Sequence, residues 1–420
     1  MYFNEESSVN AIIGNNGSGK SNVMEAITII FSRVLADSKE FPFGFCIKYS
    51  IDGSGIEISN LSGELSISKN GKKVAKKGIN SIMPKALFLY YAGETDRLKE
   101  ISEGSVDKRF ETMLKKDEDI DFKFITYLSV DDFGPALLSN YVFQTETYDK
   151  ICKLVGIEEI HSPITLYLHK PRWSKHGKAD NFWSAIGTVA NELYALTQLG
   201  VYQIIDNNRS KIVIDDIAKL KDESIGAIGL FTIFKVLAQA DVLEWIRFDI
   251  VQGGKKFNYR GLSEGEQQLS QLLSILEITK DYKALFLLDE FDSYLHPNWQ
   301  RTFVDIINGI KIRGQVIFTT HSPLTLGKMK KGNILVLKDG AIFSPSAETF
   351  NRDVTEVLEE LMEVRKRPAG IEAIIAEFRN SIVHRDKEPA IEALERLKGL
   401  LSEEDPFFIT ARISMSRLER

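Results

Sequence analysis

Residues 14–21 read Gly-Asn-Asn-Gly-Ser-Gly-Lys-Ser, which fits the pattern of a glycine, any four residues and then Gly-Lys-Ser. A short apolar segment, residues 9–13, precedes this stretch, and residues 22–34 follow it with apolar side chains at helical spacing. A strand, a glycine-rich turn and a helix in this order predict a loop whose backbone N–H groups face a phosphate chain at the start of the helix.

Lys20 is placed to reach the β- and γ-phosphates, and the Ser21 hydroxyl is placed to ligate Mg²⁺. A glycine-rich turn that binds nothing is the alternative, and the strand, the helix and the Lys-Ser pair argue against it. We therefore predict that the chain binds a nucleoside triphosphate, through residues Asn15, Asn16, Gly17, Ser18, Gly19, Lys20 and Ser21.

The composition is that of a soluble globular protein, with 420 residues of which 43% are hydrophobic and 27% charged. No apolar run approaches the roughly 20 residues that span a bilayer. The acidic N-terminus leads straight into the glycine-rich loop, so we expect no cleaved signal peptide, no membrane contact and a cytoplasmic protein. Cys46 and Cys152 lie in apolar surroundings without metal-ligand spacing, and we expect both to be buried thiols.

The pattern along the chain divides it into four parts. We expect an α/β lobe over residues 1–92, a mainly helical lid over 93–225, a second α/β lobe over 226–345 and a charged helical extension over 346–420. The Asn70-Gly71 pair predicts a tight hairpin in the first lobe. Apolar segments typical of buried parallel strands lie at residues 85–91, 284–288, 315–319 and 334–337.

Two carboxylates, Asp289 and Glu290, follow the apolar strand at residues 285–288. An acid at the end of a strand beside a phosphate loop can hold the hydration shell of Mg²⁺, which suits Asp289, and Glu290 is placed to polarise an attacking water. A solvated acidic pair that opens a helix is the alternative, and the glycine-rich loop makes it less favourable.

Two further polar motifs flank the acidic strand in the sequence. Ser263 and Glu266 form a capping-box pattern at the start of a helix, where the hydroxyl and the helix N–H groups could meet a phosphate. His321 follows the strand at residues 315–319 and could donate a hydrogen bond to a γ-phosphate. Ordinary helix capping and a structural histidine are the alternatives.

The four elements, in this order and spacing, resemble the ATP-binding-cassette (ABC) superfamily over residues 1–92 and 225–345. Residues 290–297 and 320–323 look like its soluble RecF and SMC-like branch, not its transporter branch. The resemblance implies an α/β head with a mixed sheet, in which two heads close face to face on ATP and Mg²⁺. It also implies that Ser263 and Gly265 of one head would contact the γ-phosphate held by Lys20 of the other, in a head-to-head dimer or higher homo-oligomer.

The lid distinguishes the chain from SMC-type heads. Those heads insert long heptad-patterned coiled coils, which residues 93–225 lack. A compact lid is similar to the stand-alone ATPases of prokaryotic anti-phage systems, including the ATPase subunit of Septu-type systems. This similarity implies an ATPase that regulates a separate partner nuclease. A RecF-like DNA-repair clamp is the alternative.

Some features of the branch have no clear counterpart. Only 13 residues precede Gly14, so that either Tyr2 or Phe3 would have to stack on adenine, or the chain is an N-terminally shortened product. For the glutamine that usually links γ-phosphate to the helical lobe, Gln144 and the turn at Gly93-Glu94 are the candidates.

Basic clusters and one nuclease-like motif complete the candidates. DNA contact is one interpretation of the clusters and a solvated surface is the other, since the net charge of −6 gives no global attraction to nucleic acid. Arg379 and His384 match a short motif of HEPN-type ribonucleases, although we favour an ordinary solvated helix face. The clusters are Lys69, Lys72, Lys73, Lys76 and Lys77; Lys328, Lys330 and Lys331; and Arg365, Lys366 and Arg367.

Overall fold

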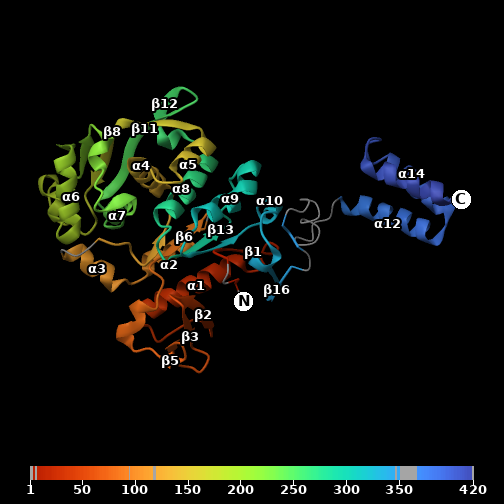
Figure 1. Cartoon of the computed structure of the whole chain (residues 1–420), viewed down its shortest axis with the longest axis horizontal. Coiled ribbons are helices and arrows are strands. Elements are labelled where there is room, and N and C mark those ends of the chain that lie inside the picture. Colours follow the sequence, from red (N-terminus) through yellow and green to blue (C-terminus); the bar gives the residue numbers. More distant parts are fainter. Residues whose placement is uncertain are drawn as a thin grey trace.

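The computed structural model describes residues 3–4, 7–93, 95–116, 120–345, 348–350 and 367–418. Its central element is a seven-stranded sheet, the head sheet, with strand order β16-β15-β1-β14-β13-β6-β7 (Figure 1). All neighbouring strands are parallel except β15 and β16, which form a hairpin. The strands are β1 (Val9–Ile13), β6 (Leu87–Tyr91), β7 (Ile125–Tyr127), β13 (Leu285–Asp289), β14 (Gln315–Thr319), β15 (Ile334–Lys338) and β16 (Ala341–Phe343).

Both faces of the head sheet are buried, because successive residues of its strands enter different hydrophobic clusters. In β6, Leu87 and Leu89 join the cluster that contains side chains of α1 (Lys20–Leu35), whereas Phe88 joins the cluster of the opposite face. That opposite face is covered by side chains of α8 (Glu264–Ile278) and α9 (Pro297–Ile310). The expected continuous apolar strands and the α/β head are therefore confirmed.

A four-stranded antiparallel sheet follows α1 in the chain and packs on the hydrophobic cluster that contains side chains of α1. The expected hairpin at Asn70-Gly71 is confirmed, with φ of 50° and 75° at these residues, as a two-residue turn between antiparallel strands requires. Cys152 is buried as expected, but the expectation for Cys46 is wrong, because β2 alternates its side chains and turns Cys46 to solvent. The strands are β2 (Cys46–Ile51), β3 (Ser54–Ser59), β4 (Ser66–Lys69) and β5 (Lys72–Lys73).

The lid differs from the helical expectation, since residues 93–225 also contain strands. Strands β8, β9 and β10 pair with β11 and β12, which lie beyond residue 225, in a five-stranded antiparallel sheet of order β12-β11-β8-β10-β9, the lid sheet. In β8, Ile164, Leu166 and Leu168 are buried on one face at a spacing of two residues, which is a strand pattern. The bounds are β8 (Ile157–His169), β9 (Val201–Ile204), β10 (Arg209–Ile214), β11 (Leu243–Gln252) and β12 (Lys255–Asn258).

Helices cover one face of the lid sheet and join it to the head. Buried side chains of the lid sheet, of α8 and of the head sheet belong to one hydrophobic cluster, so the lid and the head share a core. The helices of this region are α2 (Arg97–Gly104), α3 (Lys108–Lys115), α4 (Phe133–Phe143), α5 (Tyr148–Val155), α6 (Gly187–Leu199) and α7 (Gly226–Gln239). Short helical turns occur at η1 (Lys76–Ser81), η2 (Val130–Asp132), η3 (Ala179–Ser184), η4 (Ile217–Leu220), η5 (Tyr259–Gly261) and η6 (Lys331–Asn333), with α10 at Pro323–Leu326.

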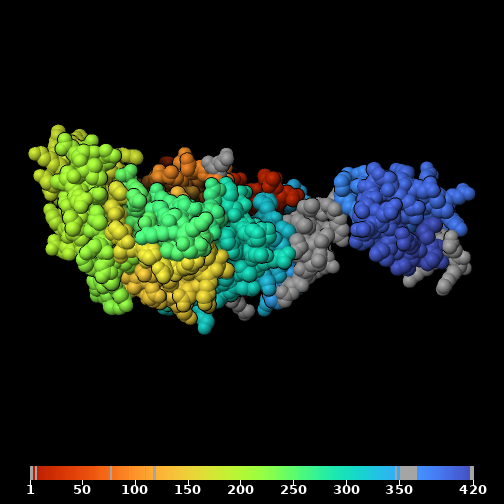
Figure 2. All heavy atoms as spheres, turned by 90° about the horizontal axis from the view of Figure 1, so that it is seen from above, coloured from red at the N-terminus to blue at the C-terminus, as the bar shows by residue number. Residues whose placement is uncertain are grey.

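The C-terminal helices, blue in Figures 1 and 2, form a hydrophobic cluster of their own. Arg367 closes this bundle through a paired ion bridge to Asp405, with N···O distances of 2.7 and 2.8 Å. Arg367 is thus engaged in the fold, whereas Arg365 and Lys366 of the same basic cluster lie outside the described residues. The helices are α12 (Ala369–His384), α13 (Lys387–Lys398) and α14 (Pro406–Leu418).

Candidate nucleotide-binding site

The glycine-rich loop connects the end of β1 to the start of α1, as expected. Gly17 and Gly19 have φ of 78° and 97°, in the left-handed region that favours glycine. A side chain at Gly14 would come within 2.2 Å of the carbonyl oxygen of Leu337, so this glycine allows the loop to approach β15. A cavity of about 350 Å³ lies beside the loop, lined by residues 14–18 and 336–340.

Lys20 is held over this loop. Its Nζ donates to the carbonyl oxygens of Gly14 and Asn15, at 3.0 and 3.3 Å, and only 5% of the residue is exposed. Burial lowers the pKa of Lys20, and the negative charges of Glu290 and Asp289 oppose that shift. The lysine therefore lies in the electrostatic field of both carboxylates, although β13 is far from it in the sequence.

The acidic pair lies at the carboxyl end of β13, in the position that the sequence predicts. Asp289 is 1% exposed, and its Oδ1 accepts a hydrogen bond of 2.5 Å from the hydroxyl of Thr319. The same hydroxyl accepts a 2.8 Å bond from the backbone N–H of Glu290, which has a φ of 50°. Thr319, at the end of β14, thus orients both acidic residues, and sequence reasoning missed this role.

The donor set is suited to Mg²⁺, which takes oxygen ligands from one or two protein groups and keeps several waters. Asp289 offers a buried carboxylate, and Ser21 offers a hydroxyl at the first turn of α1. Among the described residues, there is no group of three or more His, Cys, Asp or Glu side chains that could enclose a metal by themselves.

His321 follows β14 and lies in the electrostatic field of Lys20 and Asp289. Burial lowers the pKa of its imidazole, the positive charge of Lys20 lowers it further, and Asp289 opposes both effects. The ring is therefore neutral near pH 7 and carries one N–H donor. The structure thus brings together Lys20, Asp289, Glu290 and His321.

Asp292 connects the loop after β13 to the segment after β14. Its Oδ2 accepts hydrogen bonds from the hydroxyls of Thr320 and Thr325, at 2.5 and 2.7 Å, and the residue is 3% exposed. Burial raises the pKa of this carboxyl, and the two hydroxyl donors oppose the shift. The side chain of Gln300 makes a second connection, since it donates to the carbonyl oxygen of Asp292 and accepts from Ser322.

Ser263 and Gly265, which the ABC resemblance assigns to the nucleotide of a second copy, lie at the start of α8. Ser263 caps α8 in the expected capping box with Glu266, and it is exposed. Gly265 is buried, and a side chain there would come within 2.5 Å of the carbonyl oxygen of Tyr294. Among the described residues, no hydrogen bond or ion pair joins Ser263 or Gly265 to the phosphate loop.

Several other candidates have clear positions. The amide of Gln144 donates to Tyr141 at the end of α4, within the lid. Gly93 follows Ala92, whose N–H bonds to the carbonyl oxygen of Asp289, so the turn after β6 lies beside the site, although Glu94 is outside the described residues. Phe3 packs on the cluster around α1, and Tyr2 is outside the described residues.

The nuclease-like motif on α12 is an exposed helix face. Arg379 and His384 are both exposed, and Nδ1 of His384 lies 2.9 Å from the carbonyl oxygen of Asn380. That contact is local to the helix and provides no catalytic partner. The geometry agrees with the solvated helix face that the sequence analysis favours.

Replacing Asp292 with alanine tests the connection between the two loops. The change leaves two threonine hydroxyls without their acceptor, so we expect the free energy of unfolding in urea to fall by about 1–3 kcal/mol. Because the folded protein raises the pKa of Asp292, the folded state binds the proton more tightly than the unfolded state does. The difference between wild type and Asp292→Ala should therefore grow as the pH is lowered from 7 toward 4.5.

Asp305→Ala is the matched control. Asp305 forms an ion pair of 3.4 Å with Lys328 at the surface, where its side chain is 54% exposed. This variant should change the free energy of unfolding by less than about 1 kcal/mol. Equal stability of the Asp292→Ala and Asp305→Ala variants would contradict the proposed connection.

Comparison with known proteins identifies relatives of the class that the sequence resembles, the ATPases of prokaryotic anti-phage systems. The "Retron Vc95 probable ATPase" of Vibrio cholerae serotype O1 biovar El Tor is 23% identical over 92% of this chain and 81% of its own length. The "Septu protein PtuA" of Bacillus thuringiensis is 28% identical over 34% of this chain and 38% of its own length. The resemblance to Septu-type ATPases is thereby confirmed.

Among solved structures, the SMC head domain from Thermotoga maritima is 16% identical, with a TM-score of 0.37 over 83% of this chain and 93% of the other. A family model described as "AAA domain, putative AbiEii toxin, Type IV TA system" matches residues 9–327, which include the phosphate loop, the lid, the acidic strand and His321. The chain belongs to this family of AAA-domain proteins.

Proposed function

We propose that the chain is the ATP-hydrolysing subunit of a cytoplasmic anti-phage defence complex in a prokaryote. In this proposal, two heads dimerise on ATP and thereby regulate a separate partner nuclease. The observation that carries it is how the site is divided: Lys20, Asp289, Glu290 and His321 lie together, whereas no hydrogen bond or ion pair among the described residues joins the exposed Ser263 to them. A second copy, facing the first, would bring its Ser263 and Gly265 to the γ-phosphate.

Each side chain has a distinct task in this mechanism. The phosphate loop and Lys20 bind the β- and γ-phosphates, and Mg²⁺, held by Ser21 and Asp289, would neutralise charge on them. Glu290 accepts a proton from the attacking water, with its backbone oriented by Thr319. Neutral His321 donates its N–H to the γ-phosphate, so that the loss of this phosphate removes contacts that hold the two heads closed.

The partner nuclease is supported by the relatives of the chain, which include a Septu protein. No helix among the described residues is long and apolar enough to cross a membrane. The C-terminal bundle α12–α14 has exposed apolar side chains, including Val383 and Ile409, and is our candidate for the docking surface.

A RecF-like clamp that grips DNA on dimerisation is the second candidate function. The exposed lysines Lys72 and Lys73, on the β4–β5 hairpin, favour it because such a hairpin can contact phosphates. Purification of the tagged chain from its native host, with and without ATP, separates the two functions. A nuclease that is retained or released with nucleotide supports the defence subunit, whereas DNA without a protein partner supports the clamp.

Lys20→Ala should abolish binding of ATP, since the buried ammonium is the cation that the phosphate loop offers to the nucleotide. Isothermal titration calorimetry with a non-hydrolysable ATP analogue measures this effect. Lys331→Ala, at an exposed position in the turn η6, is the matched control and should bind as wild type does. Unchanged affinity in Lys20→Ala would contradict the assignment of the phosphate loop.

Glu290→Gln should bind ATP but hydrolyse it at least 100-fold more slowly, because the amide cannot accept the proton of the attacking water. Size-exclusion chromatography with light scattering should then find dimers that accumulate only with ATP. Adding Ser263→Arg to the same chain should restore the monomer, since the larger cation would block the contact with the second head. Wild-type turnover in Glu290→Gln would remove this residue from its proposed role.

A further inference from the structure

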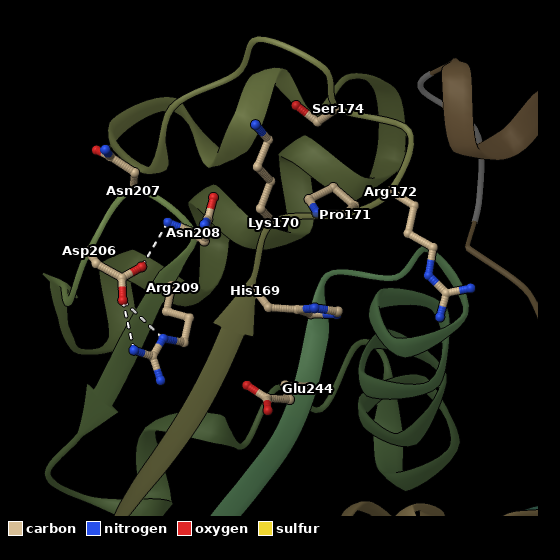
Figure 3. A pocket seen from close by; sticks show the side chains of 10 residues that line it. All are labelled: His169, Lys170, Pro171, Arg172, Ser174, Asp206, Asn207, Asn208, Arg209 and Glu244. Carbon is tan, nitrogen blue, oxygen red and sulfur yellow. Dashed lines mark hydrogen bonds and ion pairs between the residues drawn. The ribbon is translucent and has the colours of Figure 1, made fainter.

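The lid carries a second pocket, at one end of the lid sheet. Its volume is about 820 Å³, within the range of roughly 300–1,000 Å³ that is typical of small-molecule and cofactor sites. Figure 3 shows its walls coming from the segment after β8, the turn before β10 and the start of β11. The lining residues are His169, Lys170, Pro171, Arg172, Ser174, Asp206, Asn207, Asn208, Arg209 and Glu244.

The first wall belongs to residues 169–178, the basic loop, which reads His-Lys-Pro-Arg-Trp-Ser-Lys-His-Gly-Lys. It contains four lysines and arginines and no acid, in a chain whose net charge is −6. Lys170, Lys175 and Lys178 take part in no ion pair in the described part of the chain, and the side chain of Arg172 is 95% exposed. Such a loop attracts an anion, in contrast to the chain as a whole.

The basic loop is held in one conformation by its backbone. Lys170 N–H donates to the carbonyl oxygen of Asn208 at 2.8 Å, and Arg172 N–H donates to Oδ2 of Asp241 at 2.7 Å. These bonds tie the loop to the turns before β10 and β11. The ammonium of Lys170 donates to the carbonyl oxygen of Lys175 at 3.2 Å within the loop, and the side chain of Arg172 extends into solvent, away from the other lining side chains (Figure 3). The backbone of the basic loop is therefore pre-organised, which lowers the entropy lost on binding.

Two of the carboxylates near the pocket already contact positively charged or imidazole side chains. Asp206 binds the guanidinium of Arg209, at 2.8 and 3.0 Å, and Asp241 lies 3.5 Å from His169 and 3.8 Å from Arg172. Glu244 is an exposed carboxylate of the lining. The four cations of the basic loop exceed what these acids neutralise.

An aromatic surface lies within the basic loop. Trp173 stands between two lining residues, and its side chain remains 49% exposed although its indole N–H donates to the carbonyl oxygen of Ala240 at 2.8 Å. The bond anchors the ring, and an anchored exposed indole can stack on an unpaired base. A base inside a duplex offers no free face, so this feature favours a single strand.

A row of cations and aromatic rings extends the surface along the lid sheet. Lys211, Tyr167 and Trp245 are neighbours across β10, β8 and β11, on the face opposite to the buried side chains. The rings of Tyr167 and Trp245 are stacked at 4.6 Å, and the guanidinium of Arg260 lies 4.7 Å from the ring of Trp245. Exposed Arg247 follows on the same face, and neither Lys211 nor Arg247 is in an ion pair within the described ranges.

We propose that the basic loop, its pocket and this row of the lid sheet bind the phosphodiester backbone of single-stranded nucleic acid, with a base stacked on Trp173. Lys170 and Arg172 contact phosphates at the pocket, and Lys211 and Arg247 contact phosphates further along the sheet. The surface is separate from the phosphate loop, so the proposal does not depend on the proposed function.

The test measures binding of a fluorescein-labelled 20-nucleotide single strand, as DNA and as RNA, by fluorescence anisotropy with the full chain and Mg-ATP present. Lys170→Glu/Arg172→Glu should weaken binding by roughly tenfold or more. The slope of log affinity against log salt should fall by about 1.4, since each phosphate contact on a single strand contributes about 0.7. The matched control, Lys398→Glu/Arg412→Glu at two exposed positions of the C-terminal bundle, carries the same charge change and should bind within about twofold of wild type.

Trp173→Leu separates stacking from charge. It should weaken single-strand binding by about tenfold and leave the salt slope unchanged, because a base loses its stacking partner while the phosphate contacts remain. Circular dichroism and ATP affinity confirm that each variant is folded. If the double variant fails to fold, Lys170→Gln alone should still lower the salt slope by about 0.7.

Four outcomes would overturn the proposal. They are no binding of either single strand by wild type, wild-type binding in Lys170→Glu/Arg172→Glu, an equal loss in the Lys398→Glu/Arg412→Glu control, and competition by AMP or by an unlabelled duplex as strong as by the unlabelled single strand. The last outcome would assign the pocket to a mononucleotide or to double-stranded nucleic acid.

Discussion

The parallel pairing of β1, β14 and β13 is the constraint on which the rest of the structure depends. It aligns Val9 with Val316, and Val316 with Phe286, so that all three strands end at the same edge of the head sheet. The phosphate loop leaves β1 at that edge, the acidic pair leaves β13 there, and His321 leaves β14 there. Residues more than 260 positions apart in the sequence therefore share one electrostatic field. Burial of both faces of the sheet makes this register costly to change, because a slip of one residue would exchange the two hydrophobic clusters.

Charge at this edge is stabilised by neighbours that are themselves buried. Asp289 and Asp292 are both almost fully enclosed, and each accepts hydrogen bonds from threonines that belong to β14 or to the segment after it. Thr319, at the end of the strand that precedes His321, thus orients the acids that follow β13. The loop after β13 also contacts the start of α8, where Tyr294 leaves room only for Gly265. One continuous set of contacts therefore leads from Asp289 to the exposed cap of α8 that would meet a second head.

Local patterns were sufficient for the head and insufficient for the lid. The glycine-rich loop, the acidic strand and the capping box each depend on residues close together in the sequence, and the structure contains all three elements. The lid sheet depends on pairing between β8 and β11, which are about 80 residues apart in the sequence. The alternation of Ile164, Leu166 and Leu168 is short, and it was overlooked in a region whose pattern is mainly helical. Thr319 and Asp292 were missed for a related reason, since a threonine or aspartate becomes a site residue only through the partner that folding places beside it. Arg367 belongs to a basic run in the sequence, and only its bond to Asp405 reveals that its charge is engaged.

The shared core connects the lid to the helices and strands of the head that carry the nucleotide site. The buried ion pair between Lys235 and Asp132, with N···O distances of 2.6 and 2.8 Å, joins α7 to the turn η2. Gln271 of α8 in turn donates to the carbonyl oxygen of Ser129, beside that turn. An uncompensated buried charge would remain if either partner of the ion pair moved away, so the pair opposes movement of α7 relative to η2. Because α8 also carries the cap with Ser263, the shared core connects the lid sheet to the surface that would meet a second head. Closure of two heads would then also set the positions of their two lid sheets relative to each other.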